Sequence, residues 1–196
     1  MASAKTKQRM LDSGHRTENV MRRQRGKGVD HPGREIAAVL LRGAVGVTMI
    51  AHGVRHARTL RGTASWFGSI GFREPALQAR ASAAVEVGAG ALLLAGAGTP
   101  LASAAVVSTM GVAARTVHAP NGFFITAEGW EYTANLATAV VALAANGPGR
   151  WSVDRATGLD RRIFGARAAA LAVGLGLASA ATHLVAFWTA PERAAE

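Results

Sequence analysis

Five long apolar blocks, separated by short connections, follow the polar first 34 residues of this chain and restrict what it can fold into. The blocks are Ile36 to Val54, Ala81 to Gly98, Leu101 to Val117, Tyr132 to Asn146 and Ala168 to Trp188. Each is close to the roughly 17–25 residues that cross a hydrocarbon core, the fourth being the shortest. We therefore predict an all-α polytopic membrane protein with five transmembrane helices.

A soluble, alanine-rich helical bundle is the alternative, because alanine and glycine make these blocks only weakly hydrophobic. A soluble helix of this length shows a charged face that recurs every three or four residues. The stretches Leu171 to Ala178 and Gly88 to Gly98 carry no ionisable residue on any face. The pattern therefore favours a membrane, where dense small residues also suit close helix packing.

Proline and glycine mark the connections between the blocks, as in Gly98-Thr99-Pro100 and Asn146-Gly147-Pro148-Gly149. Short connections make successive helices antiparallel, so we expect an up-and-down four-helix bundle, with the fifth span attached at its periphery through a longer polar linker. The expected organisation is a basic, disordered cytoplasmic tail over residues 1–33, a four-helix membrane domain over 34–154, and the linker with the fifth transmembrane helix over 155–196.

Charge suggests how the chain is oriented. The formal net charge is +10, and the first 34 residues are rich in lysine and arginine but lack the apolar core of a secretory signal peptide. Positive residues stay on the cytoplasmic side, which places the N-terminus inside. The tail is interpreted as a solvated segment or as a ligand for anionic lipid headgroups. Nucleic-acid binding is disfavoured, because no aromatic residue interleaves the basic ones before Trp66.

One connection carries arginines on the wrong side for this orientation. They lie between the first two spans: Arg55, Arg58, Arg61, Arg73 and Arg80. The same connection contains Trp66, Phe67 and Phe72, so we expect an amphipathic segment that lies in the membrane interface.

Glu86 is the one charged residue in the stretch Ala81 to Gly98. A carboxylate inside an apolar helix is costly and is rarely kept without a partner or a task. Antiparallel helix directions bring most ionisable groups of the apolar blocks to one end of the bundle, called here the outer end. We predict a polar cluster there, made of His52, Glu86, Arg115, His118 and Glu131.

Two further histidines, His56 and His183, are expected at the periphery of this cluster, and Arg115 is the expected partner of Glu86. Arg42 lies near the opposite end of the first span. Its side chain either snorkels to the headgroups or packs inside the bundle with a buried acid. The absence of cysteine excludes disulfides and thiolate metal sites, and we expect no metal site.

Several motifs occur in an order that resembles the DoxX family of small bacterial membrane proteins, over roughly Arg34 to Asp154. They are Arg42…His52-Gly53, Trp66-Phe67-x-Ser69-x-Gly71, Ala84-x-Glu86-x-Gly88-x-Gly90, Asn121-Gly122-Phe123-Phe124 and Gly147-Pro148-Gly149-Arg150-x-Ser152-x-Asp154. The resemblance implies a four-helix protein of the bacterial inner membrane, linked to quinone-dependent redox chemistry such as that of thiosulfate:quinone oxidoreductases. His56 stands where the family usually has lysine, and the tail and fifth span lie outside the shared region.

Three functions follow as hypotheses. The first is a quinone-binding subunit of a respiratory or redox complex, with the outer cluster as the site of the quinone and its protons. The second is a non-catalytic accessory or assembly subunit of such a complex, and the third is a small-molecule transporter. Electrons would pass to a partner subunit, because no cysteine is present for an iron–sulfur cluster and no glycine-rich fingerprint for a flavin. Haem ligation by His52 with His118 or His183 is disfavoured, since histidines near helix ends are far more often interfacial.

Overall fold

The computed structural model describes residues 32–191, and within them the chain is helical. The long elements are α2 (Pro32–Arg58), α3 (Leu60–Ser69), α4 (Pro75–Ala95), α5 (Thr99–Ala113), α6 (Glu131–Asn146) and α8 (Gly165–Phe187). The short ones are η1 (Ala114–His118), η2 (Ala119–Asn121), η3 (Ile125–Ala127), α7 (Val153–Thr157) and η4 (Leu159–Arg161). The predicted all-α class is confirmed, and the predicted basic tail lies almost wholly outside the described residues.

Three helices in the described part are long and apolar enough to cross a membrane: α2, α5 with its extension to Asn121, and α8. The predicted membrane environment is thereby supported. α6 has 16 residues, which span about 24 Å and fall short of a hydrocarbon core of about 30 Å. α4 is less apolar than the candidate spans of these three helices, because it includes Gln78, Arg80 and Glu86. The five-span topology therefore remains a prediction.

The outer faces of these helices carry large apolar side chains, and their inner faces carry small ones. Exposed examples are Ile36, Val39, Leu40, Val47, Leu175, Leu177 and Val185, all at least 47% exposed. A water-soluble bundle of this kind would bury such residues. Lipid solvates them instead, so the distribution of side chains agrees with a bilayer.

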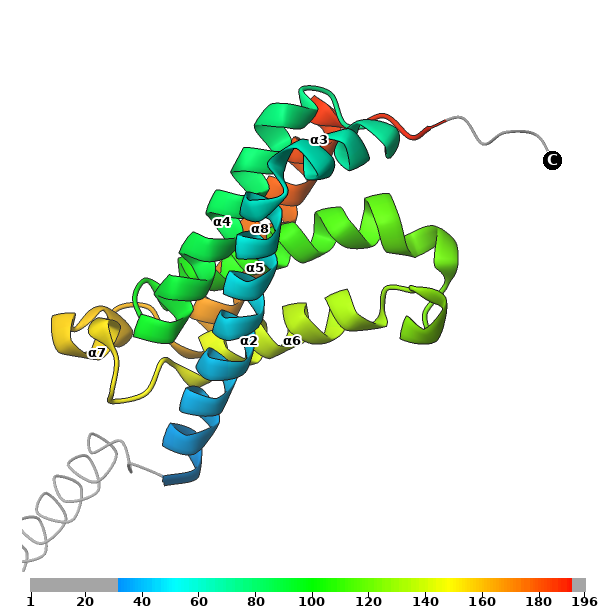
Figure 1. Ribbon diagram of the computed structural model, residues 1–196. Coiled ribbons are helices and arrows are strands. Elements are labelled where there is room, and N and C mark those ends of the chain that lie inside the picture. The colour runs from blue at the N-terminus through cyan, green and yellow to red at the C-terminus, as the bar shows by residue number, and fades with distance from the viewer. Residues whose placement is uncertain (1–31, 192–196) are drawn as a thin grey trace, which may run out of the picture. The chain divides into compact units, whose positions relative to one another are not determined.

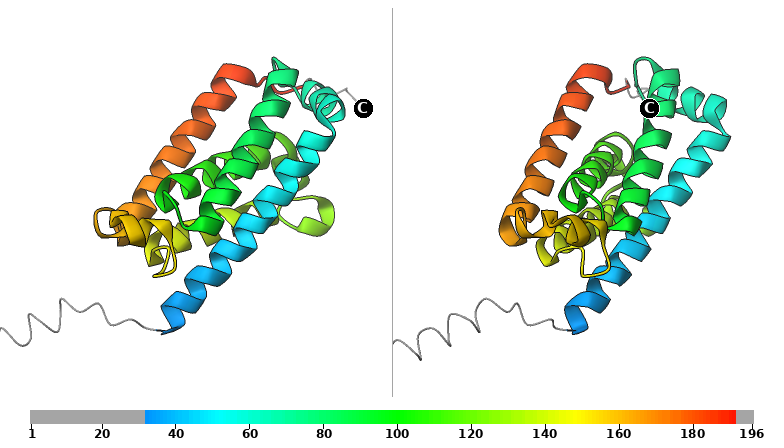
Figure 2. Two further views of the ribbon diagram at one scale, coloured as in Figure 1. Left: turned by 60° about the vertical axis from the view of Figure 1, so that its left-hand side comes forward. Right: turned by 90° about the vertical axis from the view of Figure 1, so that its left-hand side faces the viewer.

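The helices form two groups within residues 33–191. α2 and α4 lie side by side, α8 runs in a similar direction on the far side of α5 and α6, and α5 and α6 form a hairpin that is inclined to these helices (Figures 1 and 2). α5 packs against α4, α6 and α8. The connection between α5 and α6 projects away from α3 (Figure 1). A regular up-and-down bundle requires the ends of all its helices to line up. The ends of the hairpin here do not line up with the ends of α2 and α4.

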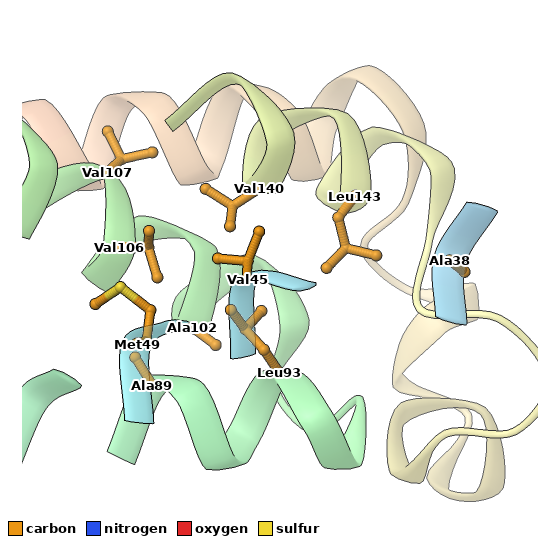
Figure 3. Packing of buried hydrophobic residues seen from close by; sticks show 10 residues of the cluster. All are labelled: Ala38, Val45, Met49, Ala89, Leu93, Ala102, Val106, Val107, Val140 and Leu143. Carbon is orange, nitrogen blue, oxygen red and sulfur yellow. The ribbon is translucent and has the colours of Figure 1, made fainter. Parts of the chain in front are cut away.

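The larger of two buried apolar clusters in the described residues joins four of the helices (Figure 3). Its buried members are Ala38, Val45 and Met49 of α2, Ala89 and Leu93 of α4, Ala102, Val106 and Val107 of α5, and Val140 and Leu143 of α6. Most of these side chains are small or β-branched, which lets the helices approach closely. The core thus joins the four helices that were predicted to form the bundle.

The fifth helix, α8, is not peripheral, and that expectation was wrong. It packs against α5 and α6, where a Cβ added at Gly176 would lie 2.6 Å from the Cβ of Val107. Further along, Ala168 and Ala172 form a second buried cluster with Ala144 of α6. Glycine and alanine on this face of α8 have little or no side chain, so α8 can approach α5 and α6 closely.

The contact between α2 and α4 depends on glycine at Gly90. A Cβ there would lie 2.6 Å from the carbonyl oxygen of Gly46 and 3.0 Å from the backbone nitrogen of Ile50. We predict that Gly90→Ala lowers the free energy of unfolding by about 1–3 kcal/mol, because the backbones must separate. Thermal unfolding of the detergent-solubilised protein measures this.

Gly88 provides the matched control on the same helix, since a Cβ there would meet nothing within 4 Å. Gly88→Ala should leave stability unchanged or raise it by up to about 1 kcal/mol, because alanine is the better helix former. Equal effects of the two substitutions would show that the close approach of α2 and α4 contributes nothing to stability.

Candidate functional site

A pocket of about 340 Å³ lies among α3, α4, α5, η1 and α8, with His56 of α2 also in its wall. Its polar lining consists of His56, Gln78, Ser82, Glu86, Ser108, Thr109, Thr116, Ser179 and His183. Its aromatic lining consists of Trp66, Phe67 and Phe72. The volume is in the range of small-molecule sites, which are mostly apolar with a few polar groups.

The polar stripe of α4 faces this pocket. Gln78, Ser82 and Glu86 are spaced four residues apart, which places them on one side of the helix, and Gln78 and Glu86 are each 4% exposed. Because α4 begins at Pro75, Glu86 lies about three turns, or about 16 Å, inside the helix. It is therefore deeper than a span that starts at Ala81 would place it.

The carboxylate of Glu86 is only partly satisfied. Ser82 Oγ donates a hydrogen bond of 2.6 Å to Oε1. His56 Nδ1 lies 3.3 Å from Oε2 and 3.3 Å from Ser82 Oγ. The first distance permits an ion pair when His56 is protonated, but its geometry is not that of a hydrogen bond, so Oε2 is buried without a donor. Such a group is uncommon in a folded protein and marks a candidate for a ligand or a proton.

Arg115, the expected partner of Glu86, lies elsewhere, and that expectation was wrong. Its guanidinium carbon is 4.7 Å from the centre of the Trp188 ring, an arrangement that cation–π attraction favours. Arg115 belongs to η1, a π-helical turn that continues α5. Turns of this kind often occur at functional sites, and here Thr116 and Val117 of the same turn line the pocket.

The other residues of the predicted cluster lie outside the pocket. His52 is exposed and stacks against Tyr132, with ring centres 6.4 Å apart. His118 Nδ1 donates to the carbonyl oxygen of Glu128 at 2.6 Å, and Glu131 Oε2 accepts from the backbone nitrogen of Ile125 at 2.9 Å. The last two contacts hold the turn between α5 and α6. Because that hairpin is inclined, its loop does not reach Glu86.

The structure therefore brings together Glu86 and the two histidines expected at the periphery. His56 is the nearest ionisable neighbour of Glu86. His183 lines the same pocket from α8, with its ring centre 5.9 Å from that of Phe72. The sequence analysis missed Gln78 and Ser82, although their four-residue spacing from Glu86 was a signal that could have identified them.

Arg42 packs inside the helices, near the end opposite the pocket. It is 8% exposed, and its guanidinium donates to the carbonyl oxygens of Leu93 at 3.0 Å, Pro148 at 3.1 Å, Trp151 at 2.7 Å, and Leu94. The last carbonyls of a helix lack partners within it and carry partial negative charge. Arg42 therefore caps the end of α4 and holds the segment after α6.

Asp154 has the complementary role at the start of α5. It is 2% exposed, and its carboxylate accepts hydrogen bonds from the backbone nitrogens of Gly98 at 2.6 Å and Thr99 at 2.8 Å. A carboxylate at a helix N-terminus satisfies free N–H groups and interacts favourably with the dipole. The motif from Gly147 to Asp154 thus supports the turn between α4 and α5.

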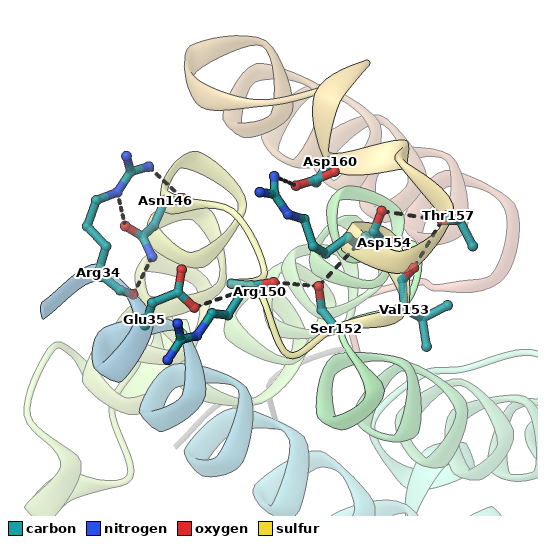
Figure 4. A network of polar contacts seen from close by, with 11 residues as sticks. Arg34, Glu35, Asn146, Arg150, Ser152, Val153, Asp154, Thr157 and Asp160 are labelled. Atoms are coloured by element: carbon teal, nitrogen blue, oxygen red, sulfur yellow. Dashed lines mark hydrogen bonds and ion pairs between the residues drawn. The ribbon is translucent and has the colours of Figure 1, made fainter. Parts of the chain in front are cut away.

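The same segment is tied to the beginning of α2 (Figure 4). Arg34 donates to the side chain and the carbonyl oxygen of Asn146 at 3.2 and 2.8 Å. Glu35 Oε2 accepts from the backbone nitrogen of Arg150 at 2.8 Å. These contacts join segments that are more than 100 residues apart in the chain, so this end of the structure is a polar scaffold.

Loss of the Arg42 side chain should destabilise the fold. We predict that Arg42→Met lowers the free energy of unfolding by at least about 2 kcal/mol, because it leaves buried carbonyl groups without donors. Arg42→Lys should recover only part of this loss, since one ammonium group does not reproduce the fork of a guanidinium. Chemical unfolding in detergent measures both, with the exposed Arg58→Met on the same helix as the control. Equal stability of Arg42→Met and Arg58→Met would contradict the capping role.

Comparison with known proteins identifies part of this structure. The family model DoxX matches residues 37–119. This range runs from the second turn of α2 into η2 and includes His56, Ser82 and Glu86, whereas α6, α7 and α8 lie beyond it. No curated protein and no solved structure matches the chain.

Proposed function

Since the DoxX family model matches residues 37–119 of this membrane protein, we propose that it is the membrane subunit of a quinone-linked redox complex and that its pocket holds the quinone head group. The observation that carries the proposal is Glu86, a buried carboxylate with one oxygen unpaired in the wall of a pocket with an aromatic side. This pocket replaces the larger cluster expected from helix directions.

The lining fits the chemistry of a quinone. A quinone ring has two apolar faces, which aromatic side chains such as Trp66, Phe67 and Phe72 can contact. Its oxygens lie in the plane of the ring and accept hydrogen bonds, which the Gln78 amide and a protonated Glu86 can donate. Both are nearly buried, so these polar contacts would form away from bulk water and count for more than at a surface.

A proton route leads from Glu86 towards the outside. Reduction of a quinone takes up two protons with two electrons, and its reversal releases them. Ser82 donates to Glu86 and lies 3.3 Å from His56 Nδ1, and the His56 side chain is 22% exposed whereas that of Glu86 is 5% exposed. A proton on Glu86 can thus move through the Ser82 hydroxyl to the more accessible imidazole. His56, which replaces the usual lysine of the family, is the outer member of this relay.

We place the start of α2 on the cytoplasmic side of a bacterial inner membrane. The connection between α6 and α8 is hydrogen-bonded to that end of α2, and it carries Arg150, Arg155, Arg161 and Arg162. Positive residues in short connections favour the cytoplasmic side. The pocket would then lie towards the opposite side of the membrane.

A second candidate is an accessory subunit that joins a redox complex without binding quinone. It is favoured by the exposed apolar tip between α5 and α6, where Phe123, Phe124 and Ile125 are 45%, 68% and 50% exposed. Such a patch fits an interface with another subunit. Both candidates require a partner, because the chain has no cysteine for an iron–sulfur centre of its own.

Glu86→Leu should weaken quinone binding. The reconstituted wild-type protein should bind decylubiquinone or menadione saturably, read from quenching of tryptophan fluorescence, since Trp66 lines the pocket. We expect the substitution to raise the dissociation constant about tenfold, because leucine cannot replace the hydrogen bond that a protonated Glu86 donates to a quinone oxygen. Ser82→Ala should weaken binding less.

Glu131→Leu is the matched control, because this acid caps the turn at Ile125 and does not line the pocket. It should leave the dissociation constant unchanged. The proposal fails if the wild-type protein does not bind either quinone, or if Glu86→Leu binds as tightly as Glu131→Leu.

A further inference from the structure

The C-terminal helix α8 forms part of the pocket wall although it lies outside the family match. Ser179 and His183, one helical turn apart on the same face, both line the pocket. The match ends at residue 119, and α8 begins at Gly165. The site therefore includes side chains from a helix that the family match does not cover.

The end of α8 is tied to the connection between α3 and α4. Arg73 N donates to the carbonyl oxygen of Phe187 at 2.8 Å, and Thr189 N donates to that of Gly71 at 3.0 Å. Trp188 Nε1 donates to the carbonyl oxygen of Ile70 at 2.8 Å. These bonds join α8 to the aromatic side of the pocket, so His183 is held in a defined place.

Gly71 permits this junction. Its φ is +96°, a value that L side chains rarely adopt, and a Cβ there would lie 2.0 Å from the carbonyl oxygen of Thr189. The backbone of the α3–α4 connection can approach the end of α8 only because residue 71 has no side chain. Gly71 also belongs to the aromatic motif that begins at Trp66.

His183 is a polar group with apolar neighbours. Its ring centre lies 5.9 Å from that of Phe72 and 5.4 Å from that of Phe187, and no hydrogen bond to its ring nitrogens is found among residues 32–191. An imidazole carries one donor and one acceptor when neutral. Its hydrogen-bonding capacity is thus available to a molecule in the pocket.

We propose that α8 completes the ligand site and that His183 is its second hydrogen-bonding group, acting from a different helix than Glu86. The pocket then takes ligands with two oxygens on opposite edges of one ring, such as a para-quinone or its quinol. Glu86 holds one oxygen and His183 the other. This inference rests on the proposed function. It assigns to His183 the preference for a ligand with two oxygens over an analogue with one.

Calorimetric titration of the full-length protein in detergent tests the inference with two probes. Menadione carries carbonyl groups on opposite edges of its ring, and 1-tetralone is a related bicyclic compound with one carbonyl. Wild-type protein should bind menadione at least about tenfold more tightly than 1-tetralone. His183→Phe should remove most of that difference, because it lowers the affinity for menadione about tenfold and leaves that for 1-tetralone nearly unchanged.

His183→Gln should keep most of the affinity for menadione, since the amide retains a donor and an acceptor. His52→Phe is the matched control, because His52 is exposed and stacks on Tyr132 outside the pocket, and it should change neither affinity. If His183→Phe does not fold, His183→Leu takes its place and should show the same loss of affinity for menadione. The affinities of the wild-type protein for the two probes give a second test that needs no variant.

The outcomes separate this inference from the proposed function. Absence of binding of both menadione and decylubiquinone by the wild-type protein overturns both. Tight menadione binding that Glu86→Leu weakens and His183→Phe leaves unchanged overturns the role of His183 alone. Equal affinities of the wild-type protein for menadione and 1-tetralone also overturn the two-oxygen site and leave the role of Glu86 standing.

Discussion

The turn between α4 and α5 depends on two buried side chains of opposite charge. Helix ends leave carbonyl and N–H groups without partners, and lipid supplies none. Arg42 satisfies the carbonyls at the end of α4, and Asp154 satisfies the N–H groups at the start of α5. The point where one helix stops and the next begins is therefore set by residues from α2 and α7. Because α4 carries Glu86 and α5 carries the hydroxyl wall of the pocket, these two caps position both sides of the site.

Small residues decide how closely the remaining helices approach. Apolar lipid provides no hydrophobic drive for helices to associate, so close packing must supply the attraction. Gly46 and Gly90 bring α2 against α4, and Gly176 brings α8 against Val107 of α5. The large apolar side chains lie on the outside. Polar groups at the level of the pocket are consequently enclosed by helices on several sides, where a carboxylate such as Glu86 can be kept away from lipid.

The sequence predicted the helices well and the site only in part. Apolar blocks and proline or glycine connections located the long helices to within a few residues. α4 begins at Pro75, six residues before the apolar block that starts at Ala81, as a proline that opens a helix allows. Glu86 was identified because a charge in an apolar helix is conspicuous. Its neighbours from other helices were not, because α2 brings His56 and α8 brings His183 to the pocket. Arg115 and His118 were placed near Glu86 on the assumption that all helices are parallel to one axis.

Local composition by itself determined the helical class, the membrane environment, the helix boundaries and the importance of Glu86, since these follow from hydropathy, turn residues and the cost of a buried charge. Only the tertiary structure decided which end-of-helix groups share a pocket. The inclination of α5 and α6 carries His118 and Glu131 away from Glu86, and the glycine contacts of α8 bring His183 to the pocket. Helix crossing angles depend on how ridges and grooves of several helices fit together, and no single segment of the sequence contains that information.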